Sequence, residues 1–272
     1  MSTTAEASID PAPSGGGAPL VELRNVGKSY GNIIALKDIN LRVGAGQVTG
    51  VLGDNGAGKS TLIKIIAGLH KPTEGELLLD GEPVTFDSPK DALNKGIATV
   101  YQDLAVVSLM PVWRNFFLGN ELRKKGLLKS LDANGMRATT ISELKKMGID
   151  LPDVDAPIGS LSGGQRQCVA IARAIFFGAR VLILDEPTAA LGVKQSGMVL
   201  RYITAAKEQG FGVIFITHNP HHAHMVGDHF VLLNRGRQKL DCTYDEITLE
   251  HLTQEMAGGN ELEALTHELG RR

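Results

Sequence analysis

Cysteine is scarce in this 272-residue sequence: Cys168 and Cys242 are the two present, and they form no C-x-x-C pair. We therefore expect reduced thiols rather than a disulfide framework. Charge of one sign is also lacking, because 28 Lys and Arg face 30 Asp and Glu, and this balance argues against a nucleic-acid binder. Long apolar runs are absent too, since the most apolar stretch, residues 168–184, contains Arg173 and Arg180. Any membrane role therefore requires a partner.

Glycine, in contrast, is abundant, with 32 residues against about 19 expected at the usual frequency of roughly 7%. Three of them lie in residues 1–19, which hold almost nothing apolar to bury, so we expect a disordered tail there. This segment has neither the basic nor the apolar part of a secretory signal. Residues 251–272 are expected to form a C-terminal helical extension with an apolar stripe at Leu262, Leu265 and Leu269.

Between these ends, short apolar runs alternate with helical patterns. Residues 21–26 and 36–43 alternate apolar and polar side chains, which predicts half-exposed antiparallel strands. Four further runs are almost wholly apolar and predict parallel strands buried on both faces, namely residues 48–52, 97–101, 181–184 and 212–217. The order of strands and helices predicts an α/β fold. Residues 103–177 are too long for a simple connection and predict an inserted helical subdomain.

The strongest chemical signal is Gly53-Asp-Asn-Gly-Ala-Gly-Lys-Ser60, a complete G-x-x-x-x-G-K-[ST] pattern. It follows a predicted strand and opens an amphipathic helix, which is the context of a phosphate-binding loop rather than of an ordinary glycine turn. Lys59 would reach the β- and γ-phosphates of a nucleotide and the Ser60 hydroxyl would hold Mg²⁺. The predicted nucleotide-binding residues here are Gly53, Asp54, Asn55, Gly56, Ala57, Gly58, Lys59, Ser60 and Thr61.

A second signal is the pair of carboxylates that ends the apolar run at residues 181–184. Asp185 would lie at the carboxyl edge of the sheet near Mg²⁺, and Glu186 would polarise the attacking water. Acidic pairs also occur in turns and helix caps. The phosphate loop in the same chain favours the catalytic interpretation.

A third motif, Leu161-Ser-Gly-Gly-Gln165, begins a second predicted helix. Its hydroxyl and bare glycine backbone suit an anion at a helix N-terminus. The alternative is an ordinary Ser N-cap with glycines for a tight entry. One chain already holds phosphates at residues 53–60, and a nucleotide on another copy would give this turn a use.

These motifs together resemble the ATP-binding subunit of an ABC transporter, over about residues 20–250. The resemblance implies a P-loop NTPase core with an antiparallel β subdomain and an inserted α-helical subdomain, the ABC ATPase domain. It also implies a head-to-tail dimer, in which each ATP lies between residues 53–60 of one copy and Ser162, Gly163, Gly164 and Gln165 of the other.

The same resemblance gives roles to three further residues. Tyr30 sits where the family places an aromatic ring that stacks on adenine, although a plain strand-end tyrosine is the alternative. Gln102 matches the family glutamine that reaches Mg²⁺ and the γ-phosphate side. His218 matches the histidine that contacts the γ-phosphate. The implied catalytic residues are thus Glu186, His218, Lys59 and Gln102, and the implied metal ligands are Ser60, Gln102 and Asp185.

One departure from the family pattern is Gly192, which stands where an aspartate usually touches the opposite subunit. The run Ala-Leu-Gly is similar to that of monosaccharide importers, as is Met110-Pro-Val-Trp-Arg-Asn-Phe-Phe-Leu-Gly119. Fructose-type members carry a single nucleotide domain, as this chain does, whereas ribose-type relatives usually carry two. We therefore expect a homodimer that energises import of a sugar, a monosaccharide such as fructose.

The resemblance further implies two integral membrane permease subunits, a periplasmic or lipid-anchored sugar-binding protein, and a peripheral location at the cytoplasmic face of the cell membrane. A soluble ABC ATPase that acts on nucleic acid or ribosomes is the alternative, and an importer of another small solute is a third reading. Against the nucleic-acid alternative stand the lack of a basic stripe and the short distance between Gln102 and Leu161, which leaves no room for a long coiled coil.

Two residue clusters remain. His218, His221, His222, His224 and His229 fall within 12 positions, and we expect all but His218 to be solvated surface histidines, because no cysteine or carboxylate pattern completes a metal site. Apolar residues also gather in residues 103–119, which contain the one tryptophan. We expect half of them to be core, and the resemblance implies that the rest line a groove for a cytoplasmic helix of the membrane subunit.

Overall fold

The structure, a computed structural model, describes residues 18–125 and 129–257. Apart from residues 18 and 19, the predicted N-terminal tail lies outside these ranges, as does the leucine stripe of Leu262, Leu265 and Leu269. None of the helices in the described ranges has the length and apolar character that crossing a membrane requires.

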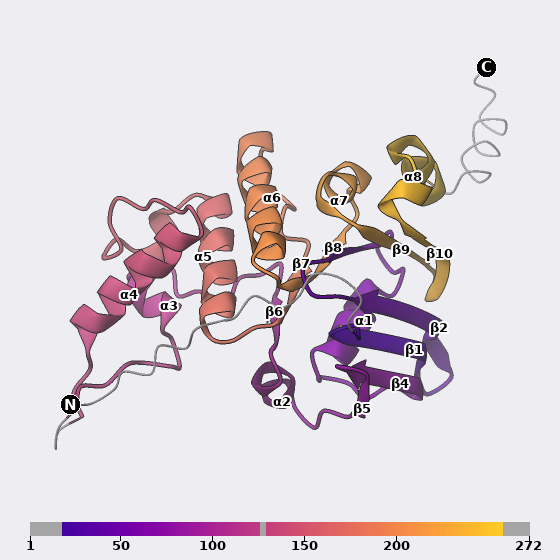
Figure 1. Ribbon diagram of the computed structural model, residues 1–272, viewed down its shortest axis with the longest axis horizontal. Coiled ribbons are helices and arrows are strands. Elements are labelled where there is room, and N and C mark those ends of the chain that lie inside the picture. Colours follow the sequence, from indigo (N-terminus) through magenta and orange to yellow (C-terminus); the bar gives the residue numbers. More distant parts are fainter. Residues whose placement is uncertain (1–17, 126–128, 258–272) are drawn as a thin grey trace.

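The strands of the described part form one sheet in the order β5-β4-β1-β2-β10-β9-β3-β8-β7-β6 (Figure 1). In chain order the strands are β1 Val21–Tyr30, β2 Ile33–Val43, β3 Val48–Leu52, β4 Glu74–Leu79, β5 Glu82–Val84, β6 Ile97–Val100, β7 Val181–Asp185, β8 Gly212–Thr217, β9 His229–Asn234 and β10 Arg237–Thr243. The helices are α1 Lys59–Ile66, α2 Pro89–Asn94, α3 Val112–Phe116, α4 Ala133–Lys146, α5 Gly163–Phe176, α6 Val193–Glu208, α7 Pro220–Val226 and α8 Leu249–Met256, with short 3₁₀ turns at Ile158–Ser160 and Tyr244–Glu246.

The four wholly apolar runs are parallel strands, as predicted. β8 pairs in parallel with β3 and β7, and β6 pairs in parallel with β7. The two alternating runs also pair as predicted, because β1 and β2 are antiparallel. A single parallel pairing, Arg237 with Lys37, joins the antiparallel strands to the rest of the sheet.

Alternate residues of the parallel strands point into two separate hydrophobic cores. Leu182 and Leu184 of β7 belong to one core, and Val181 and Ile183 belong to the other. The same alternation holds along β8. Helices α5 to α8 lie along one side of these strands, whereas α1 and the antiparallel strands lie on the opposite side (Figure 1). Burial on both faces explains why these strands read as continuous apolar runs.

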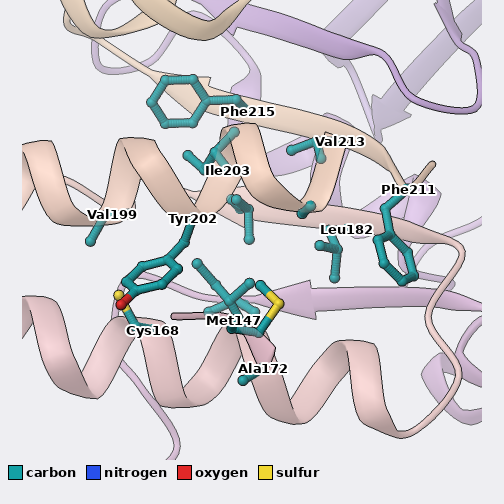
Figure 2. Close-up of a cluster of buried hydrophobic side chains, with 14 of the residues drawn as sticks. Met147, Cys168, Ala172, Leu182, Val199, Tyr202, Ile203, Phe211, Val213 and Phe215 are labelled. Atoms are coloured by element: carbon teal, nitrogen blue, oxygen red, sulfur yellow. The ribbon is translucent and has the colours of Figure 1, made fainter. Parts of the chain in front are cut away.

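The core beneath α5 and α6 is shown in Figure 2. Side chains of β7 and β8, among them Leu182 and Phe215, meet Ile203 of α6 and Ala172 of α5 there. The Tyr202 hydroxyl, at the edge of this core, donates to the Gly148 carbonyl at 3.1 Å. The helices after β6 thus share one core with the sheet.

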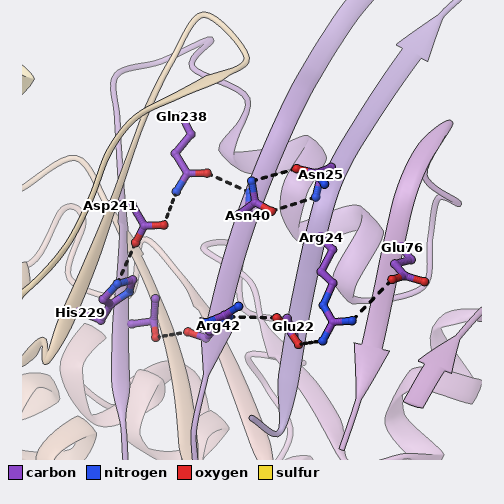
Figure 3. Close-up of polar contacts among 10 residues, drawn as sticks. Glu22, Arg24, Asn25, Asn40, Arg42, Glu76, His229, Gln238 and Asp241 are labelled. Carbon is purple, nitrogen blue, oxygen red and sulfur yellow. Dashed lines mark hydrogen bonds and ion pairs between the residues drawn. The ribbon is translucent and has the colours of Figure 1, made fainter. Parts of the chain in front are cut away.

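The antiparallel strands are tied together by polar contacts (Figure 3). Glu22 of β1 is 3% exposed, and it accepts from Arg24 at 2.7 Å and from Arg42 of β2 at 2.9 Å. The hydrogen bond from Arg24, helped by Arg42, holds the pKa of Glu22 below its usual value. Asn40 of β2 in turn donates its backbone N–H to Gln238 of β10 at 2.9 Å. These contacts tie β1 to β2 and β2 to β10.

The chain between β6 and β7 contains the helices α3, α4 and α5, joined by long irregular segments. Half of the apolar residues at 103–119 are core, because the side chains of Val112, Trp113, Phe116 and Phe117 are buried. The two phenylalanines pack against Phe176 and Phe177 at the end of α5, with ring centroids 5.5–6.2 Å apart. Other members of the segment remain exposed.

Candidate functional site

The glycine loop between β3 and α1 is tightly enclosed by its neighbours. Gly53 has φ +148°, and a Cβ atom there would stand 2.5 Å from the Leu233 carbonyl oxygen. Gly58 has φ +109°, and its Cβ would stand 2.6 Å from Cδ2 of Leu36. These positions need glycine for both space and backbone conformation. Gly58 is also the N-cap of α1, where no side chain caps the first turn, so the turn's donors are open to a ligand.

An open pocket of about 560 Å³ lies above this loop. It gathers residues from the loop and from the carboxyl ends of β6 and β7. The predicted site residues that line it are Asp54, Asn55, Gly56, Gly58, Lys59, Ser60, Thr61, Gln102, Asp185 and Glu186. Gly53 and Ala57 line a smaller pocket of about 230 Å³ on the other side of the loop. The phosphate loop and the two carboxylates predicted to work with it are thus brought together.

Glu186 is the centre of the polar contacts in this pocket. Its Oε2 lies 2.9 Å from Nδ1 of His218, and its Oε1 lies 3.8 Å from Nζ of Lys59. The side chains of Lys59 and Glu186 are about nine-tenths buried, while His218 is exposed. Lys59 also donates to the carbonyls of Gly53 and Asp54. A carboxylate so placed can accept a proton from a water molecule in the pocket.

Asp185 ends β7 one residue earlier. Burial, together with the neighbouring charge of Glu186, raises the pKa of Asp185 above its usual value. A cation beside Asp185 would stabilise its charged carboxylate and so oppose the effects of burial and of the Glu186 charge. Ser60 and Gln102 add a hydroxyl and an amide oxygen to the same pocket, and oxygen donors of this kind suit Mg²⁺, which takes few protein ligands beside phosphate and water. The donor set therefore fits Mg²⁺ on a nucleotide.

Tyr30 lies outside the residues that line this pocket. Its ring, 42% exposed at the end of β1, meets the ring of His70 edge-on at 5.7 Å. Nζ of Lys28 lies 5.2 Å from its centroid. The stacking of Tyr30 on adenine stays a prediction.

The turn before α5 is capped by its own side chains. Ser162 Oγ accepts from the Gln165 N–H at 3.3 Å, and Gln165 Oε1 accepts from the Ser162 N–H at 2.9 Å, so the expected Ser N-cap is present. Gly163 and Gly164 face the start of α6, where added Cβ atoms would stand 2.6 Å from Leu191 Cδ2 and 3.2 Å from Gln195. None of these four residues lines the pocket above the phosphate loop. Their contact with a nucleotide stays a prediction that requires a second copy.

Five pocket residues were missed from the sequence, namely Ile33, Ile34, Ala35, Arg235 and Gly236. They come from the start of β2 and from the β9–β10 turn, which meet because Lys37 N–H donates to the Gly236 carbonyl at 2.8 Å. Gly236 N–H in turn donates to Ala57 of the phosphate loop at 2.9 Å. Arg235 and Gly236 both have positive φ, and the sequence Asn-Arg-Gly-Arg could have predicted a hairpin turn at this position. Nothing in the sequence tied that turn to the phosphate loop.

The interpretation of the other histidines as solvated was wrong for three of them. His222, His224 and His229 are partly buried. His222 bonds Thr188, His224 stacks on Phe230 with ring centroids 5.9 Å apart, and His229 pairs with Asp241 at 2.8 Å (Figure 3). The packing of α7 and β9 against their neighbours explains the burial. In the described ranges, no group of three or more His, Cys, Asp or Glu side chains is arranged to hold a metal.

Comparisons with known proteins agree with this site. A family model described as "ABC transporter" matches residues 36–189. The chain is 42% identical to the xylose/arabinose import ATP-binding protein of Sulfolobus acidocaldarius, over 87% of this chain and 93% of that protein. It is 39% identical to the fructose import ATP-binding protein of Rhizobium meliloti, over 89% and 95%. A solved dimeric ATP-binding cassette in a post-hydrolysis state with ADP and Pi matches with a TM-score of 0.68 at 29% identity, over 82% of this chain and 98% of that one.

The match extends over the parts that build the pocket. The family model includes the phosphate loop, the end of β6 and the carboxylates after β7. The two relatives are covered over almost their whole length. The resemblance drawn from the motifs and its P-loop fold are therefore confirmed. The chain belongs to the ABC transporter family, as an ATP-binding ATPase subunit.

Proposed function

We propose that two copies of this chain bind ATP between them and hydrolyse it with Glu186 as general base. Hydrolysis would energise import of a monosaccharide through two integral membrane permease subunits. A sugar-binding protein would deliver the sugar to them. The names of the xylose/arabinose and fructose relatives support sugar import, and the dimeric cassette with ADP and Pi supports the pairing of subunits. The chain then works at the cytoplasmic face of the membrane as a peripheral subunit.

The observation that carries this proposal is the position of Glu186. Its carboxylate lies in the pocket above the phosphate loop, within 2.9 Å of His218 and 3.8 Å of Lys59. Phosphoryl transfer needs positioned charges and an oriented water more than covalent help. Backbone N–H groups of the loop and Lys59 would bind the phosphates, Glu186 would accept the proton of the attacking water, and His218 would hold the Glu186 carboxylate in place.

Ser60, Gln102 and Asp185 are the residues that would hold Mg²⁺. When bound, Mg²⁺ neutralises charge on the phosphates. Asp185 is half-buried beside Glu186, and this placement raises its pKa. Such a carboxylate gains from an opposite charge nearby. Its role in this proposal is to orient the nucleotide end that faces Glu186.

The second copy is needed because the turn at Ser162–Gln165 lies away from the pocket of its own chain. Gly163 is half-buried and Ser162 already caps α5. In a head-to-tail dimer the backbone of this turn would face the phosphates bound by the other copy. Each chain would thus complete the site of its partner.

A separate apolar surface supports contact with a permease. A pocket of about 300 Å³ lies between β6, α2 and α5, and Leu93, Tyr101 and Leu104 are among its lining residues. Two apolar side chains of the segment after β6 are exposed, Val107 at 46% and Leu109 at 89%. Apolar anchors around such a hollow suit an amphipathic helix of a partner.

The alternative of a soluble ABC ATPase that acts on nucleic acid or ribosomes is not favoured. The similar proteins are import subunits, and the chain carries no excess of basic residues. Import of a small solute other than a monosaccharide remains the competing form of the proposal.

Glu186→Gln tests the proposal, because it keeps the shape of the side chain and removes its capacity to accept a proton. We expect the variant to bind ATP normally, to hydrolyse it at least about 100-fold more slowly, and to elute as a dimer in the presence of ATP. Glu208→Gln makes the same chemical change at the exposed end of α6 and is expected to behave as the wild type.

Near-normal turnover by Glu186→Gln would refute the role of Glu186, and an ATP-bound monomer would refute the shared site. Uptake of labelled xylose, arabinose, fructose and ribose is then compared between cells that carry the wild-type chain and cells that carry Glu186→Gln. Loss of uptake of one of these sugars supports monosaccharide import. Unchanged uptake of all four would favour another solute.

A further inference from the structure

A hydrogen bond outside the predicted site joins the loop after Glu186 to helix α7. Nδ1 of His222, in the first turn of α7, lies 2.9 Å from Oγ1 of Thr188. Thr188 is 6% exposed and follows Glu186 by two residues. The contact therefore connects the chain segment that carries the proposed general base to the helix that follows His218.

The loop that carries Glu186 has a backbone that needs support. Glu186 has φ +48° and Ala190 has φ +57°, a left-handed conformation that costs a residue with a side chain about 1–2 kcal/mol. Such conformations persist where surrounding contacts hold them. Here Glu186 N–H donates to the Ile216 carbonyl at 2.9 Å, and Ala189 N–H donates to the Glu186 carbonyl at 3.0 Å. The His222–Thr188 bond adds a side-chain contact to these backbone ones.

His222 is itself fixed relative to His218. Its backbone N–H donates to Oδ1 of Asn219, the N-cap of α7, at 3.2 Å. Asn219 N–H donates to Oγ1 of Thr217, at the end of β8, at 3.0 Å. Two connections therefore join Glu186 to the start of α7. Glu186 contacts His218 directly, and Thr188, two residues after Glu186, bonds His222, whose N–H bonds Asn219 next to His218.

We propose that His222 is a positioning residue for ATP hydrolysis, which holds Thr188 so that the Glu186 carboxylate stays beside His218 and Lys59. This inference rests on the proposed role of Glu186. His222 is not among the residues that line the pocket above the phosphate loop. It acts through Thr188 on the orientation of the general base.

The protonation state of His222 is consistent with this role. Burial, followed by the charges that His221 and His218 acquire on protonation, lowers the pKa of His222 below its usual value. The ring is therefore neutral at neutral pH. Nδ1 of a neutral imidazole can accept the hydroxyl hydrogen of Thr188, or donate to its oxygen in the other tautomer.

The experiment measures kcat and KM for ATP in variants of both partners. His222→Phe keeps a ring but removes the polar atom, and Thr188→Val keeps the shape but removes the hydroxyl. For each we expect kcat to fall by about ten- to hundredfold, the scale of a displaced catalytic group, while KM changes little because the phosphate loop is intact. His222→Asn places an amide near the position of Nδ1 and is expected to recover most of the loss. His221→Phe, at the exposed neighbour, is the matched control and should behave as the wild type.

Combined variants separate positioning from general destabilisation. Each single substitution removes the same His222–Thr188 hydrogen bond. The double variant His222→Phe/Thr188→Val should therefore lose no more kcat than either single variant. Full additivity of the two losses, or normal kcat in soluble, folded Thr188→Val, would overturn the proposal. A lower Tm with unchanged kcat in both single variants would also overturn it.

Failure of this inference differs from failure of the proposed function. If Glu186→Gln is slow and the His222 and Thr188 variants are normal, the positioning role alone is wrong. If Glu186→Gln itself turns over normally, the role of Glu186 is wrong. With Glu186 already replaced by Gln, adding His222→Phe should cause no further loss of kcat, because its effect acts through that carboxylate.

Discussion

The N-termini of α1 and α5 both follow glycine-containing motifs, yet their first turns are satisfied in different ways. No side chain caps α1, whose N-cap is Gly58. Ser162 and Gln165 cap α5 reciprocally. The start of α1 thus leaves its donors for a ligand, whereas the start of α5 is stable within one chain. The phosphate loop leaves backbone donors free to bind a ligand, whereas the side chains of the second turn stabilise the start of α5.

The glycines of the two motifs differ in the same sense. At Gly53 an added Cβ would strike a backbone carbonyl, and the backbone is left-handed. At Gly163 it would strike the far end of the Leu191 side chain, which can move. The phosphate loop is therefore fixed by backbone packing, and the α5 turn is shaped by contacts that can adjust.

The largest expected effect tests this difference in crowding. Gly53→Ala should lower the free energy of unfolding by about 2–4 kcal/mol, because overpacking and backbone strain add. Gly163→Ala should lower it by less than about 1 kcal/mol, since alanine also favours the helix. Chemical denaturation of both variants measures the two values. Equal losses would show that the two turns are equally rigid.

A pair of serine substitutions tests the difference in capping. Ser60 is exposed in the first turn of α1, so Ser60→Ala should leave Tm within about 1 °C and weaken Mg²⁺-dependent ATP binding by at least about tenfold. Ser162→Ala removes a cap worth about 1 kcal/mol, which should lower Tm by about 2–4 °C.

ATP binding to isolated Ser162→Ala chains should equal that of the wild type, because the turn at Ser162 lies outside the pocket of its own chain. Titration calorimetry at concentrations that keep the chain monomeric measures this, with and without Mg²⁺. Weaker binding by Ser162→Ala monomers would contradict the division of roles between the two turns.

The sequence was sufficient where the residues are adjacent or end parallel strands. The phosphate loop is one continuous motif, so its spacing defines the site. Gln102 and His218 follow strands β6 and β8, and Asp185 ends β7; the carboxyl ends of these strands meet at one edge of a parallel sheet. That rule placed Asp185 beside the phosphate loop, whereas the roles of Gln102 and His218 came from the resemblance to the family.

The rest depended on contacts that no local pattern encodes. Ile34 and Arg235 line the pocket because β2 and β10 pair through a single residue pair. The burial of Glu22 required Arg24 of its own strand and Arg42 of the neighbouring β2, and its polar character had indicated an exposed face. The bond from His222 to Thr188 likewise joins residues 34 positions apart. Such pairings follow from the curl of the sheet and from side-chain packing.

The N-terminus of α6 is a third case, and it gives the smallest expected effect. Its N-cap is Gly192, with no side-chain cap, and a Cβ there meets nothing within 4 Å. Gly192→Asp should therefore fit without strain and raise the free energy of unfolding by a few tenths of a kcal/mol, because Asp caps a helix better than Gly. Thermal denaturation with Gly192→Ala as the control measures the gain. A loss of stability would show that the loop before α6, like the phosphate loop, requires glycine, and that open space around a helix start does not by itself decide which residue it accepts.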